Sequence, residues 1–156
     1  MSDEADPAFS GAVHGTSVVI DGRGVLIRGP SGAGKSDLAL RLIDRGALLL
    51  ADDYTHIARV GDAVIGSAPK RIAGLIEVRG LGLVSMPHLP RAPVVLVVQL
   101  VAEQPDRHPA PLPSCTLCGV GLPILSINGF EASAPIKIEL ALRQITGQTG
   151  AQEPLP

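Results

Sequence analysis

The glycine-rich segment at residues 29–36 constrains the fold of this chain more than any other feature of its sequence. It fits the pattern G-x-x-x-x-G-K-[ST] at every fixed position, as Gly29-Pro30-Ser31-Gly32-Ala33-Gly34-Lys35-Ser36. A β-branched run at 25–28 precedes it, and apolar residues at helical spacing follow it as far as Arg45, where Gly46 is a natural stop. A strand, a glycine-rich loop and a helix in this order predict a phosphate-binding loop.

The residue types in this loop suit a phosphorylated ligand. Glycines let the backbone fold around phosphate oxygens and present N–H groups at a helix N-terminus, where the helix dipole also favours anions. Lys35 would bridge the outer phosphates, and the Ser36 hydroxyl would ligate the Mg²⁺ that accompanies a nucleotide. The flanking strand and helix disfavour the alternative, a glycine-rich turn that merely precedes a helix.

A second acidic group is needed for the metal, and the sequence offers one away from the usual place. The apolar run at 94–101 has Gln99 where an aspartate is expected. Asp52 and Asp53 instead follow an apolar run at 47–51, which places two carboxylates at the carboxyl end of a strand, where ligands of open α/β sheets bind. A solvated turn is the alternative for this pair.

The rest of the chain predicts an α/β domain with a mixed sheet. The runs on either side of Asp21-Gly22 and of Gly61-Asp62 predict β-hairpins. Buried or short strands are expected at 47–51, 76–79, 94–101 and 122–127, a loop at 105–113, and a second helix at 135–146 between an N-cap at Ser133 and a stop at Gly147. Because strands and helices alternate in only part of this order, the sheet should not be purely parallel.

Length and composition favour one domain with an aliphatic core. A chain of 156 residues falls within the usual size of a single domain and needs no disulfides for stability. Hydrophobic residues make up 46% of the chain and aromatic residues only 2%, so valine, isoleucine, leucine and alanine must fill the core. We expect a folded domain at 11–147 between flexible ends at 1–10 and 148–156.

Charge and hydropathy exclude several functional classes. The chain has 13 basic and 15 acidic residues, which argues against nucleic-acid binding through a basic surface. Its longest apolar run is about half of what a membrane span needs, and the acidic start lacks the layout of a signal peptide. We therefore expect a cytoplasmic protein with no membrane partner. Cys115 and Cys118 have C-x-x-C spacing, which can indicate zinc or redox chemistry, but without a second pair we expect two reduced cysteines in a loop.

Four segments together resemble one family. They are His14-Gly15, the loop at 29–36, Ala51-Asp52-Asp53 and residues 75–82, and their order and spacing are similar to those in the catalytic domain of HPr kinase/phosphorylase. Residues 77–82 resemble the signature sequence of that family, and the likeness covers roughly residues 12–146. The resemblance implies a P-loop-containing kinase domain, with a mixed β-sheet flanked by helices. It implies a bacterial enzyme that uses ATP and Mg²⁺ to phosphorylate a regulatory serine of the phosphocarrier protein HPr.

The resemblance also implies roles for particular residues. Asp53 matches the acid/base aspartate, which accepts the proton of the serine hydroxyl and returns a proton, or activates phosphate, in reverse. The other implied site residues are an active-site histidine at His14, the loop lysine Lys35, magnesium ligands at Ser36 and Glu77, and a catalytic arginine at Arg107. Asp52 would support Asp53, and Arg79 would either bind phosphate or pair with Glu77.

The chain departs from the family pattern in two places. Full-length members carry a separate N-terminal domain that has no counterpart here, so a short form is expected, assembled as a homo-oligomer like the hexamers of its relatives. Residues 127–133 stand where members have an arginine-rich loop used in phosphorolysis, and they contain no arginine. The resemblance is therefore weaker for the phosphorylase reaction than for the kinase reaction. A small-molecule kinase and a catalytically silent nucleotide sensor remain as alternatives.

Overall fold

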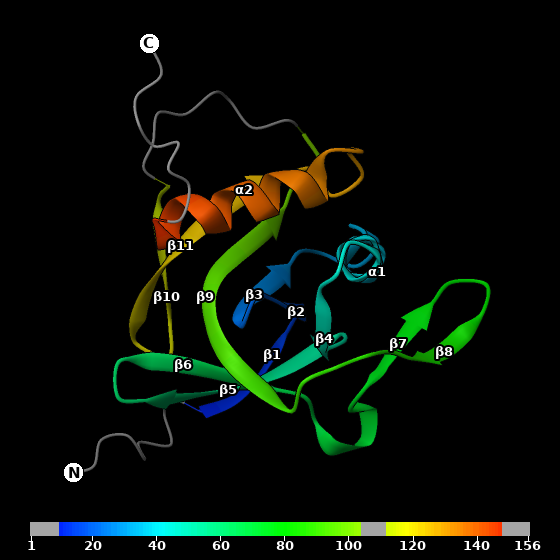
Figure 1. Cartoon of the computed structure of the whole chain (residues 1–156), viewed down its shortest axis with the longest axis horizontal. Helices are drawn as coiled ribbons and strands as arrows, with labels where there is room; N and C mark the ends of the chain where they lie inside the picture. The colour runs from blue at the N-terminus through cyan, green and yellow to red at the C-terminus, as the bar shows by residue number, and fades with distance from the viewer. Residues whose placement is uncertain (1–9, 104–111, 148–156) are drawn as a thin grey trace.

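The computed structural model describes residues 10–103 and 112–147, and its main element is a mixed sheet of nine strands. The helices are α1 (Lys35–Asp44) and α2 (Ala134–Thr146), with a short 3-10 turn at Lys70–Ile72. In chain order the strands are β1 (Ser10–His14), β2 (Thr16–Ile20), β3 (Arg23–Arg28), β4 (Leu48–Ala51), β5 (Tyr54–Val60), β6 (Ala63–Ser67), β7 (Leu75–Val78), β8 (Gly82–Ser85), β9 (Arg91–Leu100), β10 (Ser114–Leu117) and β11 (Val120–Ile127). The α/β class and the mixed sheet are as the sequence predicts (Figure 1).

Sheet topology brings three strand ends together. The strand order is β1-β5-β6-β9-β3-β2-β4, and β11, which also pairs with β10, joins β9. The long strand β9 pairs antiparallel with β6 near its start and parallel with β3 and β11 further along, and Figure 1 shows it bending between these partners. Because β3, β9 and β11 are parallel, the loops after β3 and β11 lie at one edge of the sheet, where ligands of such sheets bind.

Both predicted hairpins form, and positive φ angles explain them. Asp21 and Gly22 have φ values of 52° and 80° between β2 and β3, and Gly61 has a φ of 62° between β5 and β6. Two-residue hairpin turns favour such left-handed residues because they match the twist of the strands. The hairpin β2–β3 thereby directs β3 into the glycine-rich segment.

The core has two sides, divided by the sheet. One hydrophobic cluster contains residues of both helices together with Val25 and Ile27 of β3, whereas Leu26 between them belongs to a second cluster without helical residues. This alternation follows from the two-residue period of a strand. Arg45 links the helices through hydrogen bonds of 2.9 and 2.8 Å to Glu139. Neither described helix is long and apolar enough to cross a membrane.

Several expected boundaries differ from the structure. β1 begins at Ser10, the last residue of the expected N-terminal end; residues 1–9 and 148–156 lie outside the described part of the chain. β9 begins at Arg91 and includes Pro93, which the sequence alone marks as a break. Ser133 occupies the N-cap position of α2, but its side chain makes no capping hydrogen bond.

The expected loop around the two cysteines is wrong. Cys115 lies in β10, which pairs with β11, and Cys118 lies in the hairpin turn with a φ of 54°. Both thiols are free, and burial raises the pKa of Cys118. β10 is short and mixed in polarity, so its pairing with β11 defines it more than its own residues do.

Candidate active site

The glycine-rich segment connects β3 to α1 as predicted. Gly32 and Gly34 have φ values of 82° and 94°, in the left-handed region that favours glycine. Lys35 is the first residue of α1 and only 8% exposed, and its Nζ donates to the carbonyl oxygens of Gly29 and Pro30 at 2.8 and 3.2 Å. The backbone N–H groups and the helix dipole at the start of α1 make this turn suitable for an anion.

Asp52 is the centre of a buried hydrogen-bond network. The residue is 7% exposed, and its Oδ1 accepts hydrogen bonds from Ser36 Oγ at 2.6 Å and from Thr16 Oγ1 at 3.0 Å. Its Oδ2 accepts from the backbone N–H of Glu77 at 2.9 Å. One carboxylate thus joins the phosphate loop, β2 and β7. The alternative interpretation, that Asp52 lies in a solvated turn, is wrong, because this side chain is buried.

Asp53, the adjacent acid, points into solvent. Its φ is 70°, and the backbone N–H of Tyr54 donates to the carbonyl oxygen of Asp52 at 2.7 Å, as in a γ-turn. The Asp53 side chain is 61% exposed, and its Oδ1 lies 3.1 Å from His14 Nε2, on a ring that is 45% exposed. The structure therefore brings Asp53 and His14 together at the surface, with strained backbone of the kind that clusters at functional sites.

Hydroxyl groups of β2 and β5, which sequence reasoning missed, support both acids. Thr16 Oγ1 accepts from the backbone N–H of Asp53 at 3.0 Å while its own proton goes to Asp52. Beneath it, Ser17 and Thr55 share a hydroxyl hydrogen bond of 2.9 Å, and Thr55 also donates to the carbonyl oxygen of Gly15 at 3.0 Å. These residues look like ordinary strand residues in the sequence. Only the closeness of Thr16 and Ser17 to His14, and of Thr55 to Asp53, could have indicated a role.

The side chains of two other predicted site residues, Glu77 and Arg79, are not part of this hydrogen-bond network in the described structure. Glu77 reaches the network through its backbone N–H, and its side chain is exposed on β7. No ion pair joins Glu77 to Arg79 in the part of the chain that the structure describes, so the pairing alternative for Arg79 is wrong. Arg107 lies outside the described residues.

The donor set fits Mg²⁺ better than a softer metal. Within residues 10–103 and 112–147, no three His, Cys, Asp or Glu side chains gather as a metal cluster. The Ser36 hydroxyl, hydrogen-bonded to the Asp52 carboxylate, and the exposed Glu77 side chain, whose backbone N–H donates to the same carboxylate, instead offer hard oxygen atoms near the phosphate loop. Mg²⁺ typically binds through one or two carboxylates, the phosphates of the substrate and several waters, so these residues are compatible with it.

Fold and site define an α/β protein with a phosphate-binding loop, whose serine is hydrogen-bonded to the first of two successive acids at the carboxyl edge of the sheet. Residues 7–110 match the family model of the HPr Serine kinase C-terminal domain. The chain belongs to this family, as its motifs indicated.

Known relatives agree with this assignment. The HPr kinase/phosphorylase of Geobacillus thermodenitrificans is 43% identical over 113 residues, which cover 67% of this chain and 37% of that protein. The Burkholderia lata HPr kinase/phosphorylase is 42% identical over 144 residues, or 84% of this chain and 44% of the relative. Among solved structures, the Hpr(Ser) kinase/phosphatase from Coxiella burnetii superposes with a TM-score of 0.76 at 28% identity, covering 92% of this chain and 94% of that one. This chain spans less than half the length of these two curated relatives.

Proposed function

We propose that this chain is an ATP- and Mg²⁺-dependent protein serine kinase that phosphorylates the phosphocarrier protein HPr. The observation that carries the proposal is the network around Asp52, which links Ser36 of the phosphate loop to the backbone that positions Asp53 beside His14. A phosphate-binding group and a base for a hydroxyl are thus supported by the same side chains. The names of the relatives supply the protein substrate.

The phosphate loop is the proposed site of ATP. Backbone N–H groups of the loop would hold the phosphates, and the Lys35 amine, which now donates to loop carbonyls, would turn to the outer phosphate oxygens. Ser36 and Glu77 would hold Mg²⁺, with Asp52 as the acid that orients Ser36. When bound, the ion would neutralise part of the negative charge on the phosphates, and the protein would hold the phosphates in position.

Asp53 is the proposed base. The oxygen of the HPr serine forms a bond to the γ-phosphorus, the bond from that phosphorus to the bridging oxygen breaks, and ADP leaves with the electron pair. The proton of the serine hydroxyl passes to the Asp53 carboxylate. His14, 3.1 Å from that carboxylate, would orient it.

Exposure of the base favours a protein substrate over a small molecule. The Asp53 side chain is 61% exposed, so a bulky surface can present a serine to it without entering a closed cavity. A kinase of small molecules needs a closing lid to exclude water from the reaction. The described residues around Asp53 and Glu77 are turns and a hairpin end that leave the acids open.

The test is phosphate transfer to purified HPr in the presence of ATP and Mg²⁺, followed by mass analysis for a single phosphoserine. We expect transfer by the wild-type chain and its loss in Lys35→Ala and Asp53→Asn. Asparagine tolerates a positive φ, so the second variant should keep the turn at residue 53. The matched control is Asp62→Asn, a fully exposed acid in the β5–β6 turn, which should transfer normally. Transfer that survives both site variants would refute the assignment, and turnover of small acceptors without HPr would favour the alternative kinase.

We further propose that residues 11–147 form the catalytic domain, and that it acts in the cytoplasm as a homo-oligomer of the hexameric kind that the family resemblance implies. Light scattering on the purified chain measures the assembly.

The reverse reaction, in which inorganic phosphate takes the phosphoryl group from phosphoserine to give pyrophosphate, is measured with phosphorylated HPr. We expect it to be weak, because residues 127–133 lack arginine.

A further inference from the structure

The loop that follows β11 lies against the phosphate loop. Since β3, β9 and β11 are parallel neighbours, residues 128–133 leave the sheet at the same edge as residues 29–34. A Cβ at Gly129 would lie 2.9 Å from Leu100 Cδ1 and 3.1 Å from the carbonyl oxygen of Ala33. Only glycine permits so close an approach, so the two loops form one surface.

Two side chains fix this second loop in place. Arg41 of α1 donates from Nη1 to the carbonyl oxygen of Glu131 at 3.0 Å, and from Nη2 to the carbonyl oxygen of Gly129. Asn128 Oδ1 accepts from the backbone N–H of Phe130 at 2.9 Å. Because the helix that begins at the phosphate loop also holds residues 129–131, the position of Phe130 relative to that loop is set before any ligand arrives.

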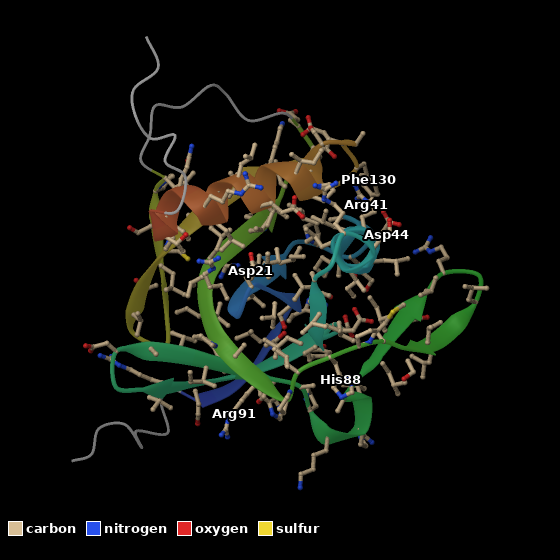
Figure 2. All side chains as sticks on the ribbon, in the orientation of Figure 1. Asp21, Arg41, Asp44, His88, Arg91 and Phe130 are labelled. Atoms are coloured by element: carbon tan, nitrogen blue, oxygen red, sulfur yellow. The ribbon has the colours of Figure 1, made fainter. Side chains whose placement is uncertain are left out.

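Phe130 is exposed although it contacts the phosphate loop. Its relative exposure is 66%, yet a Cβ at Gly34 would lie 3.0 Å from its Cε1 and 3.2 Å from its Cζ. Figure 2 shows Phe130 next to Arg41 and α1. A single exposed apolar residue needs no explanation by itself. Here, however, one of the two phenylalanines of the chain is anchored beside the glycine that precedes Lys35.

We infer that the ring of Phe130 is the stacking surface for the nucleobase of the bound nucleotide. This inference rests on the proposed function, because it takes the phosphates to be held by residues 29–36. With the phosphates at the start of α1, the ribose and base must extend over a neighbouring surface, and the loop at 128–133 is the surface in contact with Gly34. Stacking on an aromatic ring accepts any base, since each base has a π-face. ATP and GTP should therefore bind with similar affinity.

The other candidate occupant of this ring is the surface of a protein substrate. Phe130 contacts Gly34, whereas the acids that would receive a serine lie beside β1, β2 and β7. The contact with the phosphate loop therefore favours the nucleotide, and affinity measurements separate the two occupants.

The experiment compares two Mg²⁺-bound ligands, ATP and inorganic tripolyphosphate, which has the phosphates without the base. Calorimetry gives the Kd of each ligand for the wild-type chain, Phe130→Ala and Phe130→Trp, with Val60→Ala as a control at a 58% exposed apolar residue of the β5–β6 hairpin. We expect Phe130→Ala to weaken ATP about tenfold and to leave tripolyphosphate unchanged. Phe130→Trp should keep the affinity for ATP. Because the chain has no tryptophan, this variant also reports on stacking: ATP should quench its fluorescence and tripolyphosphate should not.

Each other outcome has a definite meaning. An equal loss of ATP and tripolyphosphate in Phe130→Ala would show that the ring only supports the phosphate loop, and would overturn the inference. Unchanged affinity for ATP would also overturn it, and a raised KM for HPr in the same variant would assign the ring to the protein substrate. If the wild-type chain binds neither ligand, the proposed function fails and the inference fails with it. If the wild-type chain binds both ligands and the Phe130 variants bind them as the wild type does, the inference fails and the proposed function still stands.

Discussion

Replacing Asp52 with alanine should be the most damaging single change near the site, because three donors depend on this carboxylate. The hydroxyls of Ser36 and Thr16 and the backbone N–H of Glu77 all donate to it, and the residue is 7% exposed. Alanine removes the acceptor for all three at once and leaves a gap that a buried side chain filled. The hydroxyls can rotate toward other acceptors, whereas the N–H of Glu77 cannot.

The structure allows an estimate of the size of this effect. A buried donor that loses its partner costs about 1–3 kcal/mol, and hydrogen bonds to a charged acceptor lie toward the upper end. Taking about 1 kcal/mol for each hydroxyl and about 2 kcal/mol for the N–H of Glu77 gives about 4 kcal/mol for Asp52→Ala. For a chain of this length, that loss lowers the Tm by about 10 °C. Asp52→Asn should fall between the wild type and alanine, because one amide oxygen still accepts from the two hydroxyls whereas the amide nitrogen cannot accept from the N–H of Glu77.

Thermal unfolding followed by far-UV circular dichroism measures the change, since the chain has no tryptophan for fluorescence. Asp62→Ala is the matched control: this acid is fully exposed, and among the described residues its one ion pair is a 4.0 Å contact with Arg59. Its Tm should stay within about 1–2 °C of wild type, the range expected for surface substitutions. A Tm for Asp52→Ala equal to that of the control would refute the reasoning, because the network would then contribute nothing to folding.

Three further predictions follow from other parts of the structure. Gly129→Ala would place a Cβ 2.9 Å from Leu100, so we expect it to cost about 1–3 kcal/mol in urea unfolding and to weaken ATP binding through the displaced loop. His14→Ala should lower kcat for HPr phosphorylation by about 10–100-fold while the Kd for ATP is unchanged, because the His14 side chain contacts the proposed base and the ring of Tyr54, neither of which belongs to the phosphate loop; a matching loss of ATP affinity would contradict this. Burial raises the pKa of Cys118, so the folded state keeps this proton longer than the unfolded state does. Its contribution to stability is retained below the ordinary thiol pKa and declines as the pH rises above that value, and alkylation of folded protein at pH about 8.5 should be slower at Cys118 than in a peptide.

Local sequence signals predicted the parts of the fold that local physics determines. Asp21-Gly22 and Gly61-Asp62 formed hairpins because their backbone preference matches the strand twist, and the strand, loop and helix around Lys35 formed as their spacing indicated. The sequence could not show that β10 is a strand, because a short polar segment becomes one only when β11 lies beside it. Long-range pairing also explains the start of β9. The sequence predicts a later start because Pro93 interrupts the local strand pattern, but pairing of residues 91–94 with β6 extends the strand through this proline.

The pair Asp52-Asp53 shows most clearly what a sequence leaves open at a site. Two identical residues in succession have the same local propensities, and both were placed correctly at the end of a buried strand. Their environments differ because the backbone turns at Asp53, whose φ of 70° leaves Asp52 facing inward to three donors and Asp53 facing outward to His14. That turn is held by the bond from Gly15 N–H to the carbonyl oxygen of Asp53 at 2.8 Å, and by the Thr16 hydroxyl on its N–H. Both partners are distant in the sequence, so the division of labour between the two acids is a property of the assembled sheet.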